Sequence, residues 1–176
     1  MPKKLSANFT LEELTYSDTA KKYKISNLPT PIHEKTLIHT CQYLLEPLRA
    51  LLNSKYKSYD NKKVKYVSIR ITSGYRGAAL NAKVGGAKTS GHLKGEAADI
   101  EAKLVFQDNT SKILPYTDLY KDIKAWVKEG KLSVDQCIQE CVGNSKWVHI
   151  SHSAWGKSRD RKQFLIYDGK TYKADK

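Results

Sequence analysis

The chain has 176 residues, of which 40% are hydrophobic and 28% charged, values that argue for one compact domain and against a disordered chain. Lysine and arginine number 31 against 18 aspartates and glutamates, so the formal net charge is +13. This excess favours anionic partners, which could be nucleic acid, membrane headgroups or an anionic cell-wall polymer. No segment approaches the roughly 18 consecutive apolar residues of a transmembrane helix, which excludes a helical membrane span.

The N-terminal sequence MPKKLSANFTLEEL lacks the apolar run of a signal peptide, so we expect synthesis in the cytoplasm without one. Three cysteines cannot form a full set of disulfides, and their spacing matches no zinc knuckle. We expect Cys41, Cys137 and Cys141 to be small buried apolar residues, as suits a reducing compartment.

Helical signals dominate the first third of the chain. Residues 8–24 open with Asn8 or Thr10 as a candidate cap, followed by acidic residues, an order that suits a helix N-terminus. Residues 33–52 predict a longer amphipathic helix, because apolar residues recur at spacings of three and four. Pro47 is expected to kink or split this helix. The apolar stripe consists of Leu37, Cys41, Leu44, Leu48 and Leu51.

Strand signals follow. The polar residues 53–63 are expected to form a loop, and residues 64–72 a strand in which apolar and polar residues alternate. Residues 77–84 predict a short helix that ends at the glycine pair after them. Residues 96–106 predict a second strand.

The last third mixes both kinds of element. Residues 115–130 predict a helix with one apolar face. Residues 136–141 and 146–151 predict two strands joined by a two-residue Gly-Asn turn. Residues 164–167 predict one more strand within the basic segment 157–176. Helices first, then strands and helices together, indicate an α+β domain.

The segment from Ser90 to Asp99 carries the strongest chemical signal. His92 and Asp99 lie seven positions apart among glycines and alanines, which let the backbone fold tightly around an ion. Zinc accepts imidazole nitrogen and carboxylate oxygen, and a catalytic site uses three protein ligands plus water. A third ligand is expected from His149, inside the apolar strand WVHIS, where a buried imidazole needs partners for both ring nitrogens. The alternative is a core histidine hydrogen-bonded to the backbone.

Three further histidines rank below His149 as ligands. His152 lies an odd number of positions from His149, so on a regular strand it faces the other side. His33 and His39 lie on or beside the long helix, off its apolar stripe, and are expected at the surface.

Three ordered motifs resemble one family. The run S-x-H-x-x-G-x-A-x-D is matched at every fixed position from Ser90 to Asp99, with SGYR at residues 73–76 before it and WVH at residues 147–149 after it. The opening NFTLEEL is similar as well, and the resemblance spans residues 5–152. The run resembles the signature of the zinc D-alanyl-D-alanine peptidase family, which includes phage L-alanyl-D-glutamate endolysins. The resemblance implies the small α+β fold of the hedgehog signalling domain, with N-terminal helices and a mainly antiparallel sheet that carries the zinc site.

Elements and resemblance together predict a single zinc peptidase domain over residues 1–176. Within it we expect an N-terminal helical part at residues 1–52, a catalytic core at residues 64–152 and a basic C-terminal segment at residues 157–176.

The resemblance implies one bound Zn²⁺ ion, held by His92, Asp99 and His149. Arg76 would bind a carboxylate of the substrate through its guanidinium fork, or form a structural salt bridge. Ser90 would orient the metal loop or contact the substrate. Tyr75 would contact the substrate or serve in packing.

The general base is where this chain departs from the family pattern. Many members carry an acidic residue three positions before the last histidine, and this chain has Lys146 there. Glu140 is the expected substitute. A two-residue turn pairs position 140 with 147 and 138 with 149, which places Glu140 on the face of His149, diagonally about 7–8 Å away. The alternatives are a solvent-facing Glu140 and Asp135 as the base.

These residues predict a zinc metallopeptidase that cuts peptidoglycan stem peptides or cross-links. D-Ala-D-Ala carboxypeptidase, D,D-endopeptidase and L-Ala-D-Glu endopeptidase activities all fit. We expect a monomeric phage or prophage enzyme, an endolysin or a virion-associated lysin, that reaches the wall by holin-type release or with a virion. Its basic surface would hold it on anionic envelope polymers.

Two other functions are alternatives to the peptidase. Lys146 at the usual acidic position favours a non-catalytic, zinc-containing wall-binding or virion structural module of the same fold. Specific nucleic-acid binding is disfavoured, because the sequence holds no helix-turn-helix signature, finger or paired aromatic motif.

Overall fold

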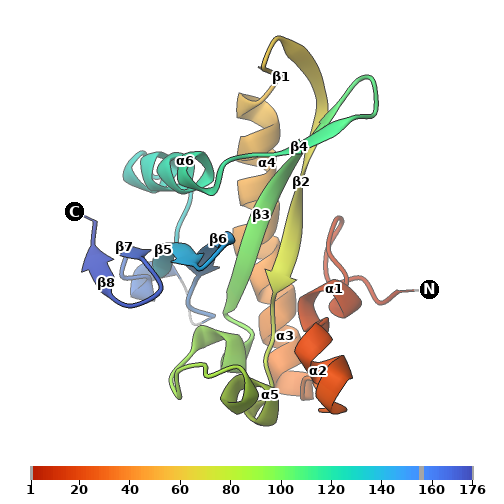
Figure 1. Ribbon diagram of the computed structural model, residues 1–176, viewed down its shortest axis with the longest axis vertical. Helices are drawn as coiled ribbons and strands as arrows, with labels where there is room; N and C mark the ends of the chain where they lie inside the picture. The colour runs from red at the N-terminus through yellow and green to blue at the C-terminus, as the bar shows by residue number, and fades with distance from the viewer. Residues whose placement is uncertain (1, 155–156, 176) are drawn as a thin grey trace.

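The computed structural model describes residues 2–154 and 157–175, which fold around a sheet of eight strands (Figure 1). The strand order is β1-β2-β3-β6-β5-β7-β8, and β4 pairs with β3. Neighbouring strands are antiparallel except β5 and β7, which run parallel. The predicted α+β class with a mainly antiparallel sheet is therefore confirmed. The strands are β1 (Ser58–Tyr59), β2 (Lys62–Ser73), β3 (Ala97–Phe106), β4 (Ser111–Ile113), β5 (Gln136–Val142), β6 (Ser145–Ser151), β7 (Gln163–Tyr167) and β8 (Tyr172–Ala174).

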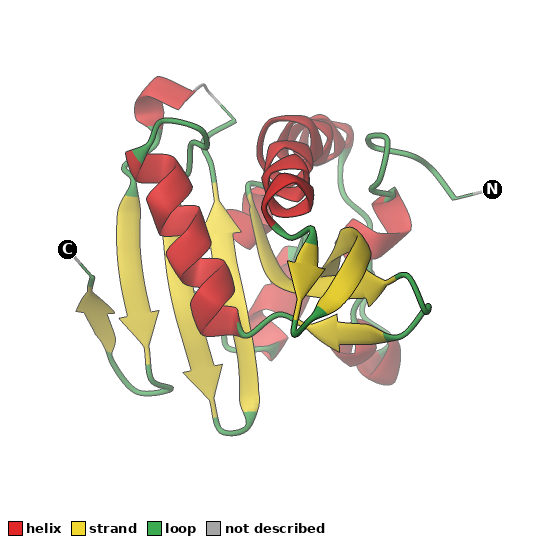
Figure 2. Cartoon of the chain, turned by 90° about the horizontal axis from the view of Figure 1, so that it is seen from above, coloured by secondary structure: helices red, strands yellow, loops and turns green. Residues whose placement is uncertain are grey.

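Helices supply the other half of the fold. Figure 2 shows α6 lying along the strands of the C-terminal half of the sheet. Within the described part of the chain, no helix combines the length and the apolarity needed to cross a membrane. The α-helices are α1 (Leu11–Thr15), α2 (Asp18–Tyr23), α3 (Pro31–Thr40), α4 (Glu46–Lys55), α5 (Ala78–Lys83) and α6 (Tyr116–Lys128). Short helical turns of other types are η1 (Cys41–Leu45), η2 (Gly91–Lys94) and η3 (Lys157–Arg159).

The segment predicted as one helix over residues 8–24 forms two. Thr10 caps α1 through a capping box with Glu13, which decides between the two predicted caps. The chain then takes an extended conformation at Tyr16, and the Ser17 side chain accepts a hydrogen bond from the Ala20 amide. A second cap inside the segment ends the first helix and starts α2, because the cap residue itself has non-helical backbone angles.

The predicted helix over residues 33–52 is one rod, formed by α3, η1 and α4 in succession. Its irregularity is the π-helical turn η1, in which the Glu46 amide donates to the Cys41 carbonyl. Pro47 follows at the start of α4 and has no amide hydrogen for the usual bond to residue 43. The wider turn before it removes the need for that bond, and the helical segment is divided there into α3 and α4, which follow each other without a loop.

The prediction of a loop over residues 53–63 was wrong in part. Asp60 and Asn61 both have positive φ angles, 49° and 60°, and connect β1 to β2 as a two-residue hairpin turn. The strand β4 was also missed. The strands β1 and β4 have two and three residues, so they carry too little periodicity to be predicted from sequence.

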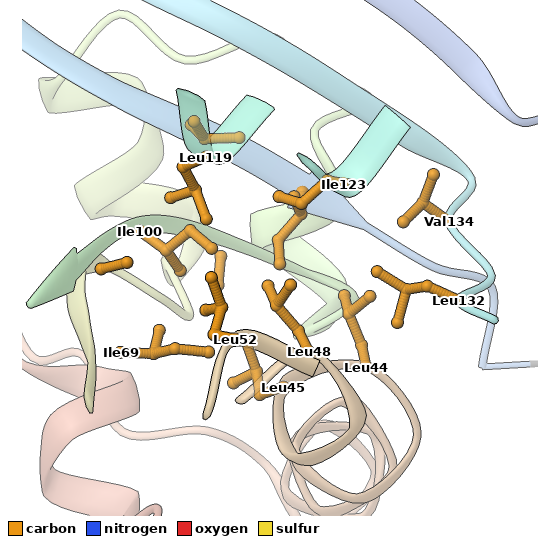
Figure 3. Packing of buried hydrophobic residues seen from close by; sticks show 14 of the residues in the cluster. Leu44, Leu45, Leu48, Leu52, Ile69, Ile100, Leu119, Ile123, Leu132 and Val134 are labelled. Carbon is orange, nitrogen blue, oxygen red and sulfur yellow. The ribbon is translucent and has the colours of Figure 1, made fainter. Parts of the chain in front are cut away.

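The two long helical elements meet in one hydrophobic core (Figure 3). Leu48 of α4 and Ile123 of α6 are fully buried there, together with Ile100 of β3. From β5 and β6, the core takes Cys137, Val148 and Ile150. Because side chains alternate along a strand, the intervening positions of β5 and β6 face away from this core. That second face carries the candidate site.

Candidate metal centre and its cleft

His92 is fixed by backbone on both sides of its ring. It lies in η2, whose first turn is capped by the Ser90 hydroxyl, which accepts a hydrogen bond from the His92 amide. Its Nδ1 lies 2.6 Å from the carbonyl oxygen of Gly74. A carbonyl oxygen only accepts, so Nδ1 carries the proton and donates it. Burial lowers the pKa of His92, which favours the neutral ring, and a neutral ring with its proton on Nδ1 has the Nε2 lone pair free for its other neighbours. Ser90 also lines the cleft described below, so both roles expected for it, orienting this loop and contacting the substrate, stay predictions.

Gly95 closes the loop and lets it lie against α3. Its φ angle is +76°, and a Cβ there would meet Leu37 Cγ at 3.0 Å and the His33 carbonyl oxygen at 3.2 Å. Only glycine takes this backbone conformation beside another chain segment without strain. The glycine in the motif therefore sets the close approach that directs His92 towards the sheet.

Asp99 and His149 come together through the sheet. They are direct partners in the pairing of β3 with β6. The Asp99 Oδ1 atom lies 2.8 Å from His149 Nδ1 and 3.2 Å from His92 Nε2, and the two histidine nitrogens are 3.2 Å apart. One ligand atom from each residue lies within 4.8 Å of the others, and all three residues are buried. The structure thus brings together the three residues that the sequence predicted as ligands.

The donor set fits a transition-metal ion. With its Nδ1 proton donated to Gly74, His92 can offer the Nε2 lone pair to a cation, and the Asp99 carboxylate beside it offers oxygen lone pairs. Burial alone would raise the pKa of the Asp99 carboxyl, but the neighbouring imidazoles of His92 and His149 hold that pKa well below its usual range. A cation between two nitrogens and one oxygen satisfies all three atoms at once, and this ligand set suits Zn²⁺. The second ring nitrogen of His92 has the backbone acceptor expected of a metal-bound histidine.

Arg76 and Glu140 lie at the rim of this cluster. Arg76 Nη2 is 3.4 Å from Asp99 Oδ2, and the side chain is 17% exposed. Burial lowers the pKa of Arg76, whereas the carboxylates of Asp99 and Glu140 raise it. Its Nε is buried without a hydrogen-bond partner among the described residues. Arg76 thus makes the salt bridge considered from sequence and keeps donors for a second carboxylate.

Glu140 stands where the predicted pairing places it. The turn at residues 143 and 144 pairs Glu140 with Trp147 and Ile138 with His149. Glu140 and His149 are therefore diagonal neighbours on one face of the sheet, about 7–8 Å apart. Burial raises the pKa of Glu140 to about 7, the nearby Asp99 carboxylate adds to the rise, and His149 and Arg76 oppose it. A half-buried carboxyl that titrates near neutrality is suited to proton transfer.

The other candidate residues have different surroundings. Tyr75 is 5% exposed and its hydroxyl lies 3.1 Å from His33 Nδ1, which favours the packing role. Asp135 makes a two-point ion pair with Arg161, which occupies its carboxylate. Lys146 is exposed, with its ammonium group 5.7 Å from the centre of the Tyr116 ring.

The remaining histidines form a separate group beside α3. His152 is buried, and its Nε2 lies 3.1 Å from the Thr40 hydroxyl and 3.4 Å from His39 Nδ1. It is not part of the metal-ligand cluster found among the described residues. His33 and His39 are half-buried at the surface, more enclosed than their position off the apolar stripe indicated. The signal that was missed is their contact with Tyr75 and His152, which no helix periodicity encodes.

The cluster lies in an open cleft of about 820 Å³ that also includes Arg76, Ser90, Glu140 and Trp147. Sequence reasoning did not assign four further side chains to it, namely Arg159, Arg161, Tyr167 and Tyr172. The tyrosines flank the sequence Asp168-Gly169, a hairpin signal that could have predicted β8 and with it the wall of the cleft.

The fold and the site together form a candidate metal centre, with three residues that could hold an ion in a cleft and a carboxyl of raised pKa beside them. The sequence profile described as Peptidase M15 matches residues 7–119, more than half of the chain. The chain therefore belongs to the peptidase M15 family, whose members are zinc-dependent metallopeptidases. The match contains His92 and Asp99 and ends before His149. No curated protein matches the chain.

Proposed function

We propose that this protein is a zinc peptidase that hydrolyses peptide bonds in bacterial peptidoglycan, as a lytic enzyme of phage or prophage type. Membership of the peptidase M15 family supports the chemistry. The motif resemblance to wall-lytic peptidases supports the substrate. The observation that carries the proposal is the convergence of His92, Asp99 and His149 in an open cleft, with Glu140 on the same sheet face.

Three buried side chains would hold the ion, and the metal contributes the electrophile. Zinc bound there would supply a Lewis acid that acidifies water and polarises the scissile carbonyl. His92 is kept in one tautomer by Gly74, and Asp99 is kept ionised. The chain thus presents a preformed set of lone pairs and needs little rearrangement to bind metal.

Glu140 is the proposed general base. In the carboxylate form it would take a proton from the attacking water and return it to the leaving amine as the bond breaks. Its position one diagonal step from His149 leaves room for a water molecule between the two side chains. Burial brings its pKa to about 7, close to the pH at which proton transfer in both directions is efficient.

Arg76 is the proposed anchor for a substrate carboxylate. The Arg76 amide donates to the His92 carbonyl, so the same backbone segment positions the arginine and a metal ligand. A guanidinium paired on one edge with Asp99 can still offer its other donors to a planar carboxylate. Binding energy at that point would hold the scissile bond in the reactive orientation.

The net charge of +13 suits an enzyme that works on an anionic envelope. We propose that the basic surface retains the protein near the wall through long-range attraction, an effect that added salt weakens.

The test is digestion of purified peptidoglycan by the zinc-loaded protein, with the soluble products identified by mass spectrometry. Wild-type protein and the control Glu129→Gln, an exposed carboxylate paired with Lys131, should release peptides. His92→Ala and Glu140→Gln should release none at matched concentration. Wild-type protein that binds one equivalent of zinc and releases nothing would instead identify a non-catalytic wall-binding module.

A further inference from the structure

The C-terminal hairpin continues the sheet face that carries the site. In the strand pairing, Trp147 is opposite Glu140, Glu140 is opposite Tyr167, and Tyr167 is opposite Tyr172. These four side chains form one row across β6, β5, β7 and β8, next to the row that contains Asp99 and His149. Adjacent strands are about 4.8 Å apart, so Tyr172 lies about 10 Å from Glu140 along the row.

The half-buried Tyr167 and the exposed Tyr172 form an aromatic wall in the cleft. Their ring centres are 4.3 Å apart at an angle of 21°, and Tyr172 is 58% exposed. Val84 and Val142, which are 43% and 44% exposed, line the same cleft. Exposed large apolar side chains scattered singly need no explanation, but here three of them gather in one concave site. Such a surface is suited to holding apolar parts of a ligand.

The hairpin that carries this wall is held in place from two directions. In its turn, the Asp168 carboxylate accepts hydrogen bonds from the Lys170 and Thr171 amides. After β8, Asp175 accepts a hydrogen bond from the Tyr120 hydroxyl of α6. The aromatic pair is therefore positioned before a ligand arrives, which lowers the entropy cost of binding.

A second cavity lies on the other side of the cluster formed by His92, Asp99 and His149. This cavity of about 990 Å³ also has Asp99 and Trp147 in its lining. It is lined by the paired strands β2 and β3, by the tip of the β5–β6 hairpin and by the start of α6, and its polar wall includes Arg70, Glu101 and Lys146. The cleft and this cavity meet at a metal ligand, so the cluster is flanked by open space on two sides.

We propose that the β7–β8 hairpin is a substrate subsite, in which Tyr167 and Tyr172 bind the part of a peptide chain that continues past the scissile bond. The inference rests on the proposed peptidase function and names its substrate class, a peptide that extends on both sides of the metal. An extended chain advances about 3.3 Å per residue, so the subsite takes a group two or three residues from the reacting carbonyl. The enzyme is then an endopeptidase, and Arg76 binds a carboxylate within the chain. The hairpin lies outside residues 7–119, where the family profile matches.

The first experiment identifies the end groups released from purified peptidoglycan by the zinc-loaded protein. New amino termini on fragments of two or more residues are expected. Free single amino acids as the only product would overturn this inference and leave the peptidase proposal intact. No release at all would reject the proposed function, and the subsite with it.

The second experiment compares kcat/KM of three variants on the same substrate. Tyr172→Ala should lower it about threefold to tenfold, the range of one lost aromatic contact, with zinc content unchanged. Tyr172→Phe should stay near wild type. Tyr66→Ala removes a strand tyrosine that is 42% exposed and lines neither cavity, and it should have no effect. Equal rates for Tyr172→Ala and Tyr66→Ala would contradict the subsite.

Discussion

Replacing Glu140 by glutamine should make the metal-free protein more stable while it abolishes activity. Burial raises the pKa of this carboxyl from 4.5 to about 7, so the folded protein holds the ionised form at a cost. Glutamine has nearly the same shape and no charge. The substitution therefore removes the cost of burying a carboxylate and the proposed base at once.

The size of the effect follows from the two pKa values. One pH unit of difference between folded and unfolded pKa corresponds to about 1.4 kcal/mol, so a rise from 4.5 to about 7 corresponds to about 3 kcal/mol. The side chain is half-buried, so water screens part of this. We expect Glu140→Gln to raise the free energy of unfolding at pH 8 by about 1–3 kcal/mol, or roughly 2–12 °C in Tm.

The stability gained by the substitution depends on pH. Between pH 4.5 and about 7 the folded state binds more protons at Glu140 than the unfolded state does, so stability falls as the pH rises. The glutamine variant lacks this fall. Urea denaturation of both proteins in the presence of a chelator, at pH 4.5, 6 and 8, should show that the difference in free energy of unfolding grows from near zero at pH 4.5 to its full size at pH 8.

Activity supplies the second half of the test. The zinc-loaded variant should lose at least about 100-fold in kcat, the contribution of a general base. Bound zinc lowers the pKa of a nearby carboxyl, so the acidic limb of the wild-type rate profile should lie below pH 7. A variant that is equally stable at every pH would show that Glu140 faces solvent, and the reasoning from burial would be refuted.

Three other predictions address the metal and its supports. His149→Ala should reduce bound zinc from one equivalent to none after dialysis, measured by metal analysis; retained stoichiometric zinc would remove this residue from the ligand set. Gly74→Ala should lower the free energy of unfolding by about 1–3 kcal/mol and weaken zinc binding about 10- to 100-fold. Its Cβ would lie 2.3 Å from the Leu14 carbonyl oxygen, so the Gly74 carbonyl that accepts from His92 would be displaced. A zinc affinity equal to that of the wild type would contradict this. Zinc at 100 times its Kd should add about 2.7 kcal/mol, or roughly 5–11 °C in Tm by calorimetry; an unchanged Tm would argue against a folded-state site.

The site was more predictable than the periphery of the fold because its geometry follows from strand parity. Once the two-residue turn between β5 and β6 is known, the pairs Glu140–Trp147 and Ile138–His149 follow by counting. The long amphipathic helices could also be predicted, since their buried apolar residues recur at helical spacing over many positions. Hydrophobic periodicity and short turns depend on residues close together in the chain, so both can be predicted from the sequence alone.

Other features depend on contacts between distant segments. The half-burial of His39 comes from its stack on His152, which lies 113 positions away. The strand β8 exists because it pairs with β7, and its three residues have no pattern of their own. Tertiary contacts therefore decided what local propensity left open.

The most direct test of the account is a titration of zinc into the metal-free protein, with peptide release from purified peptidoglycan as the readout. The rate should rise linearly to a break at one equivalent of zinc, and Asp99→Ala should stay inactive throughout. Equal rates with and without chelator, or one bound zinc without any hydrolysis, would contradict a peptidase centred on His92, Asp99 and His149.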